Sequence, residues 1–105
     1  MGFNGPEGSP VGLSTAAALT KKCREVTPHG LLGHFFGRDI LLNLLAQEGC
    51  MGIRPCHGLG GGGVQQLVAV GAGAEENDQL GTGCLVADEA MPCPPSLGSP
   101  NVLNS

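Results

Sequence analysis

Five cysteines and three histidines are the side chains in this 105-residue chain that could hold a metal ion or act as nucleophiles. Thiolates with one imidazole would suit a soft metal, and the candidate ligands are Cys50, Cys56, His57 and Cys84, with Cys93 as a further thiol. No two cysteines have the C-x-x-C spacing of a zinc or redox motif. On a strand, Cys50 and Cys56 would share one face and His57 would point to the other. Cysteine is also among the most often buried residues, so structural thiols are the favoured interpretation and a metal site is the alternative.

A nucleophilic pair of cysteine and histidine could be drawn from Cys23 or Cys50 with His29 or His34. No third residue stands at a recognisable position to orient such a histidine, and no serine lies in a nucleophile-elbow pattern. An active site needs a converging set of groups rather than single reactive side chains. The sequence therefore predicts a protein that is not an enzyme and needs no cofactor.

The glycines at positions 58, 60 and 63 match the G-x-G-x-x-G fingerprint of dinucleotide-binding proteins, and Asp78 lies about 20 residues after the first of them. In that fingerprint the last glycine opens a helix whose N-terminus holds the pyrophosphate. Here residues 64–70 follow, and their valines and alternating pattern are typical of a strand. The glycine run is therefore interpreted as a hairpin loop.

Two helices are predicted in the first half of the chain. Ser14 could cap the first, whose apolar residues recur at helical spacing up to Val26 and which residues 27–30 end. The second is expected over residues 37–48, with Gly49 as the left-handed residue after its end. Its apolar side chains form adjoining rows that would bury a wide face, namely Phe36, Ile40 and Leu44 beside Leu41 and Leu45.

Strands are expected after the second helix. Residues 50–54 predict a first strand, which Pro55 confines to a sheet edge or ends. With the glycine-rich turn at 58–63, the strand at 64–70 would complete a hairpin, and residues 83–88 predict a weaker third strand.

These elements indicate an α+β fold in which two N-terminal helices pack on a small antiparallel sheet of about three strands. Four prolines after Met91 predict an extended Pro-rich C-terminal tail. The expected organisation is a flexible lead-in at residues 1–12, a single domain at 13–91 and the tail at 92–105.

The composition restricts which cellular compartment and which classes of partner are expected. The net charge of −4 and the absence of Trp and Tyr disfavour nucleic acid as a partner. The N-terminus lacks the features of a secretory signal, and no apolar run is long enough to cross a membrane, so a cytoplasmic protein without membrane contact is expected. In that compartment an odd number of cysteines predicts reduced thiols.

The second helix carries the pattern His-Phe-Phe-Gly-Arg-Asp-Ile at residues 34–40, followed by Leu-Ala-Gln-Glu-Gly-Cys-Met-Gly-Ile-Arg at 45–54. Together with residues 66–71, 76–78 and 93–95 and the ending at 100–105, this resembles an uncharacterised family of short bacterial proteins. The chain departs from that pattern at Pro55, Cys56 and His57, where relatives usually carry aromatic residues, and at Leu97, where a second cysteine is frequent. The resemblance implies no activity.

The favoured function is a small non-catalytic interaction or self-assembling protein, because a sheet of about three strands leaves edges that must be covered or paired. Its partner would be a second copy of the chain, in a homo-oligomer, or another protein. Val102 and Leu103 are an apolar pair in the tail that could anchor such a contact. The alternative is a metal-binding or redox-linked protein that uses the cysteines and His57.

Overall fold

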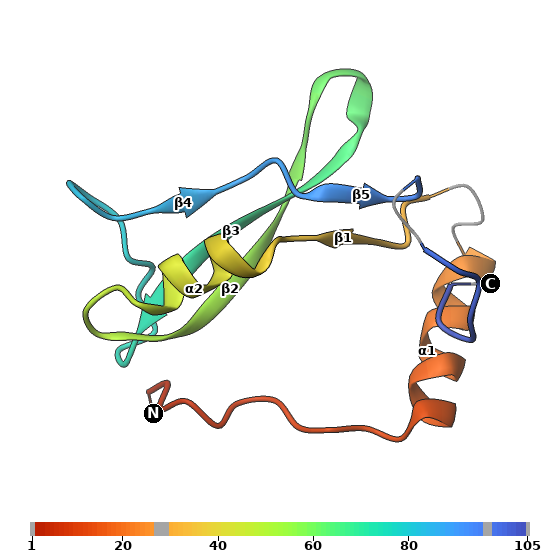
Figure 1. Cartoon of the computed structure of the whole chain (residues 1–105), viewed down its shortest axis with the longest axis horizontal. Coiled ribbons are helices and arrows are strands. Elements are labelled where there is room, and N and C mark those ends of the chain that lie inside the picture. The colour runs from red at the N-terminus through yellow and green to blue at the C-terminus, as the bar shows by residue number, and fades with distance from the viewer. Residues whose placement is uncertain (1, 27–29, 96–97, 105) are drawn as a thin grey trace. The chain divides into compact units, whose positions relative to one another are not determined.

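The computed structural model describes residues 2–26, 30–95 and 98–104. Its elements are α1 (Leu13–Val26), β1 (Gly33–Phe35), α2 (Arg38–Leu45), β2 (Cys50–Leu59), the 3-10 turn η1 (Gly61–Gly63), β3 (Gln65–Gly73), β4 (Val86–Ala87) and β5 (Met91–Cys93) (Figure 1). Two helices and two small antiparallel sheets confirm the α+β class. Residues 1–7 with 36–90 form one compact unit, and residues 8–35 with 91–105 form a second. The predicted end of the first helix and His29 lie outside the described residues, as does Leu97.

The first unit is built on an antiparallel sheet with the strand order β2-β3-β4. The predicted hairpin is confirmed, with Arg54 opposite Val70 and η1 in the connecting loop. However, β2 continues through Pro55 to Leu59, five residues beyond the predicted end of the strand. Pro55 is tolerated because β2 is an edge strand, where a missing N–H need not interrupt the ladder.

Helix α2 covers one face of this sheet (Figure 1) and supplies its core. Leu44 is fully buried and packs with Ala69 of β3 and Ala87 of β4. The buried face is narrower than predicted, because Leu45 is 46% exposed. Phe36, Ile40 and Ile53 are the partly buried residues that surround this core.

The second helix is also shorter than the predicted span of 37–48. It ends at Leu45 because the chain then turns: the Gln47 N–H donates to Leu44 O and the Cys50 N–H donates to Gln47 O. Gly49 takes the left-handed conformation, with φ of +78°, as predicted. It lies three residues after the C-cap Ala46, however, and serves the turn into β2 rather than the helix end.

A network of side-chain amides joins this turn to the sheet. Gln79 Nε2 donates to Glu48 O at 2.9 Å, and Gln47 Oε1 accepts the Leu85 N–H at 2.8 Å. Gly71 lies beneath them, where a Cβ would come within 2.5 to 3.0 Å of Gln79, Gln47 and Cys50. Such close approach of side chains to the strand explains why β3 carries glycine at position 71.

The second unit contains α1 and a two-stranded antiparallel ribbon of β1 and β5, with His34 opposite Pro92. The sequence pattern did not predict this ribbon. Helix α1 begins one residue before Ser14, which therefore lies inside the helix rather than capping it, and the Ala16 N–H donates to Gly12 O at 3.0 Å. The helix has no buried residue, so its packing on the sheet stays a prediction.

The described part of the C-terminal segment differs from the predicted extended tail. After β5, residues 102–104 form a turn. Asn101 Oδ1 accepts the Leu103 N–H and Asn104 Oδ1 accepts the Asn101 N–H, both at 2.8 Å. Asparagine side chains commonly fold the backbone in this way, and they override the extended preference of the neighbouring prolines.

Candidate functional site

The outer edge of β2 is the best-defined candidate site. The hydrogen bonds of β3 show which backbone groups of β2 point outward at this edge. The Gln79 N–H donates to Gly71 O at 2.8 Å and the Gly73 N–H donates to Asn77 O at 3.0 Å, so Gly71 and Gly73 face away from β2. Because backbone groups alternate along a strand, Val70 and Ala72 face β2. Arg54, opposite Val70, is therefore hydrogen-bonded to β3, whereas Pro55, opposite Ala69, directs its backbone outward.

The same alternation places the backbone groups of Ile53, Pro55, His57 and Leu59 on the outer edge. In the described part of the chain, β2 pairs only with β3 and no backbone partner covers these four residues. Pro55 removes one N–H from the row, so the edge presents three donors and four carbonyl acceptors. Leu59 adds an apolar side chain that is 75% exposed.

A pocket of about 330 Å³ lies along the first half of this edge. It contacts five consecutive residues of β2, from Met51 to Pro55, and also Ala72 of β3, so it extends from the edge onto the face of the sheet that carries Arg54. Its other wall comes from the N-terminal segment, through Phe3, Gly5 and Glu7. The Phe3 N–H donates to Ala74 O at 2.9 Å and ties this segment to the end of β3.

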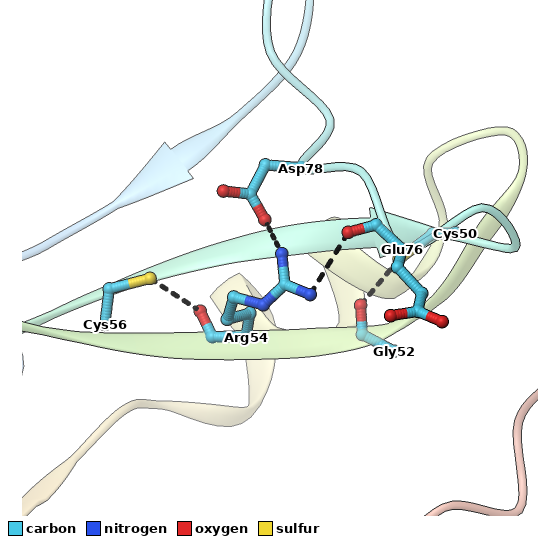
Figure 2. A network of polar contacts seen from close by, with 6 residues as sticks. All are labelled: Cys50, Gly52, Arg54, Cys56, Glu76 and Asp78. Atoms are coloured by element: carbon cyan, nitrogen blue, oxygen red, sulfur yellow. Dashed lines mark hydrogen bonds and ion pairs between the residues drawn. The ribbon is translucent and has the colours of Figure 1, made fainter. Parts of the chain in front are cut away.

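Arg54 lines the pocket and also contacts Glu76 and Asp78 in the turn after β3, as Figure 2 shows for these two contacts. Its Nη1 pairs with Asp78 Oδ1, and its Nη2 donates to Glu76 O at 3.1 Å. The Phe3 ring lies 5.4 Å from the guanidinium carbon, which is within the range of a cation–π contact. The single charged side chain of β2 is therefore paired with a carboxylate of the same chain.

Glu7 folds the N-terminal segment that forms the pocket wall. Its carboxylate accepts the backbone N–H groups of Asn4 and Gly5, each at 2.9 Å. The N–H of Asn4, with those of Glu7 itself and Gly5, lowers the pKa of the Glu7 carboxyl from its ordinary value. This wall was predicted to be a flexible lead-in, because its glycines and Pro6 give no periodic signal.

This turn is expected to respond to acid. Since the pKa of Glu7 is lower in the folded turn than in an unfolded chain, the turn is stabilised above the ordinary glutamate pKa and loses that support as the pH falls through the lowered value. In an NMR titration, the amide signals of Asn4 and Gly5 should shift together, with a midpoint below the ordinary range for glutamate. In Glu7→Gln the transition should be absent, whereas an unchanged titration of both amides would contradict this assignment.

The structure does not bring the four candidate metal ligands together. The pairing of β2 with β3 shifts register between Cys50 and Gly52, and a bulge of one residue moves a side chain to the other face. Cys50 Sγ therefore lies against Gly71 on the α2 side, while Cys56 shares the opposite face with Arg54. The prediction that the two cysteines share a face was wrong. Among the described residues, no three His, Cys, Asp or Glu side chains are close enough to hold a metal ion.

The predicted interaction residues Val102 and Leu103 lie in the C-terminal turn of the second unit. Their side chains are exposed, by 52% and 41%. Arg24 Nη1 of α1 donates to Leu103 O at 2.7 Å, so the turn is tied to a helix of its own unit. A role for the two side chains in assembly stays a prediction.

No family model matches the chain, and neither a curated protein nor a solved structure shows a significant match. In the described part of the chain, no helix is long and apolar enough to cross a membrane. The resemblance to the bacterial family stays a prediction, and a function for this chain has to be inferred from the geometry of the β2 edge.

Proposed function

We propose that this protein is a non-catalytic interaction protein that self-assembles by strand addition at β2. The observation that carries the proposal is the outer edge of this ten-residue strand, where Ile53, Pro55, His57 and Leu59 direct their backbone groups away from β3. Unpaired backbone groups along a long edge are a template for a strand of another chain. Strand addition would satisfy these donors and acceptors with ladder hydrogen bonds.

The protections that monomeric proteins place on their sheet edges are few along β2. Edge strands are often very short, or carry outward lysines that repel a second strand. The other edge strand, β4, has only two residues, whereas β2 has ten. The one charged residue of β2, Arg54, is paired with Asp78, and Pro55 removes a single donor. These features favour β2 as the edge that binds a partner.

The metal or redox function has no comparable support. The bulge after Cys50 places the two strand cysteines on opposite faces, and Cys84 is exposed in the segment before β4. We therefore do not propose it.

If the chain self-assembles through the β2 edge, the mass of the particle in solution should rise with protein concentration. This assembly should also depend on the backbone N–H of His57. His57→Pro removes an outward N–H without touching the ladder with β3, because His57 occupies the same kind of position as Pro55. In a symmetric pair of subunits two hydrogen bonds would be lost, each with a net value of about 0.5–1.5 kcal/mol, so the dissociation constant should rise about tenfold or more.

Sedimentation analysis over about a thousandfold dilution series tests this. His57→Ala is the matched control, because it keeps the backbone donor and should assemble as the wild type does. A mass of one chain at every concentration, or equal dissociation constants for wild type and His57→Pro, would overturn the proposal.

A further inference from the structure

We infer that the added strand is β2 of a second copy, paired antiparallel about a two-fold axis that passes beside Cys56. This inference rests on the proposed function and names its partner and register. In this register Ile53 faces the partner's Leu59, and Pro55 faces the partner's His57. The result would be a continuous six-stranded sheet, since each subunit contributes the order β2-β3-β4.

The missing N–H of Pro55 selects this register. With the axis at Cys56, each half of the pairing has three backbone bonds: Ile53 and the partner's Leu59 exchange two, and Pro55 O accepts the N–H of the partner's His57. An axis at Pro55 would oppose two residues that both lack a donor. An axis at His57 would place Ile53 opposite a residue beyond the end of β2 at Leu59. The Cys56 axis therefore satisfies the most edge groups.

Charge supports the same choice. An axis at Arg54 would bring two guanidinium groups together across the strands, which is destabilising for like charges directly opposite each other. With the axis at Cys56, Arg54 faces the partner's Gly58, which has no side chain. The pair of Arg54 with Asp78 can then remain as it is in the single subunit.

The side chains complement each other as well. Leu59 is 75% exposed in the single chain, and in this register it lies opposite the partner's Ile53, on the face of the sheet that α2 covers. Two-fold symmetry repeats the contact, so each subunit offers one leucine and accepts one. A second copy thus covers the exposed Leu59 through an apolar cross-strand pair with Ile53.

Cys56 provides a direct measure of the register. Residues opposite each other in a non-hydrogen-bonded antiparallel pair have Cα atoms about 4.5 Å apart, which is within the range that a disulfide spans. With oxidised glutathione as the reagent, two Cys56 thiols form one disulfide and the reagent is reduced to two glutathione thiols. We expect a covalent dimer from the wild type and from the control Cys84→Ser, and none from Cys56→Ser.

Leu59→Ala tests the cross-strand contact with Ile53 without introducing a charge. Loss of two buried leucine contacts per dimer should raise the dissociation constant about tenfold or more. The matched control is Leu80→Ala, because Leu80 is similarly exposed, at 65%, and lies outside β2. Its dissociation constant should equal that of the wild type.

The outcomes separate this inference from the proposed function. If a dimer forms and depends on the His57 N–H, yet Cys56 does not cross-link and Leu59→Ala behaves as Leu80→Ala does, the register is wrong and strand addition stands. If the chain remains a monomer throughout, both are overturned. Cross-linking through Cys56 together with weakening by Leu59→Ala supports both.

Discussion

Leu44→Ala is expected to lower the free energy of unfolding by about 2–5 kcal/mol, the range for truncating a buried leucine. Leu44 is the one large side chain of the described residues that is fully buried, and it joins α2 to Ala69 and Ala87. The neighbouring buried residues are too small to fill the space that truncation would leave. Because the core of the first unit is so small, this one change should remove much of its stability.

Denaturant unfolding of the first unit, followed through the amide signals of β3, measures this effect. Leu42→Ala is the control on the same helix, because Leu42 is 54% exposed and surface substitutions usually change stability by less than about 0.5 kcal/mol. If the two variants unfolded at the same denaturant concentration, α2 would not be the element that holds the sheet.

The parts of the fold that the sequence predicts are those in which local pattern and packing agree. Phe36, Ile40 and Leu44 recur at helical spacing, and they are the residues that α2 and the segment before it bring to the core. The valines of β3 and the glycines before them predict a hairpin, and the structure contains it. In each case the feature depends on residues close together in the sequence.

The parts that the sequence could not predict depend on contacts between distant residues. The ribbon pairs residues 33–35 with 91–93, and neither strand is long enough to give a periodic signal. The bulge after Cys50 inverts the faces of the strand cysteines, and its one local signal, Gly52, does not by itself fix the register. The wall formed by Phe3 and Glu7 likewise depends on contacts with β2, β3 and the turn after β3.

Pro55 is consistent with two interpretations of its segment, an edge strand that continues and a strand that ends there. From the sequence it marks an edge or an end, and the structure shows an edge in which the strand continues for four more residues after Pro55. As an edge residue it weakens pairing with most registers of a second strand. The missing N–H of Pro55 also disfavours the competing registers. A residue that lowers the affinity of pairing therefore also reduces the number of alternative arrangements.

Deletion of residues 92–105 is expected to abolish the ordered ribbon of the second unit while leaving the first unit folded. The deletion removes Pro92 and Cys93 from β5, and β5 is the only strand that pairs with β1 among the described residues. It also removes Cys93 O, which accepts the Leu32 N–H at 2.7 Å, and Leu103 O, which accepts from Arg24. A strand without a partner has no ladder to hold its backbone.

Hydrogen exchange resolves the two units within one sample. The Leu32 amide should exchange at least about tenfold faster after the deletion, and the last turn of α1 should exchange faster because it loses the contact of Arg24. The amides of Val70 and Ala72 should keep their protection, because their partners lie in the first unit. The full-length double variant Val102→Ser and Leu103→Ser is the control, since it removes two exposed apolar side chains and retains the backbone bonds of the turn. If the double variant lost as much protection at Leu32 as the deletion, the apolar pair rather than the backbone pairing would be what holds the segment. If the deletion left Leu32 fully protected, β5 would not be the partner that orders β1.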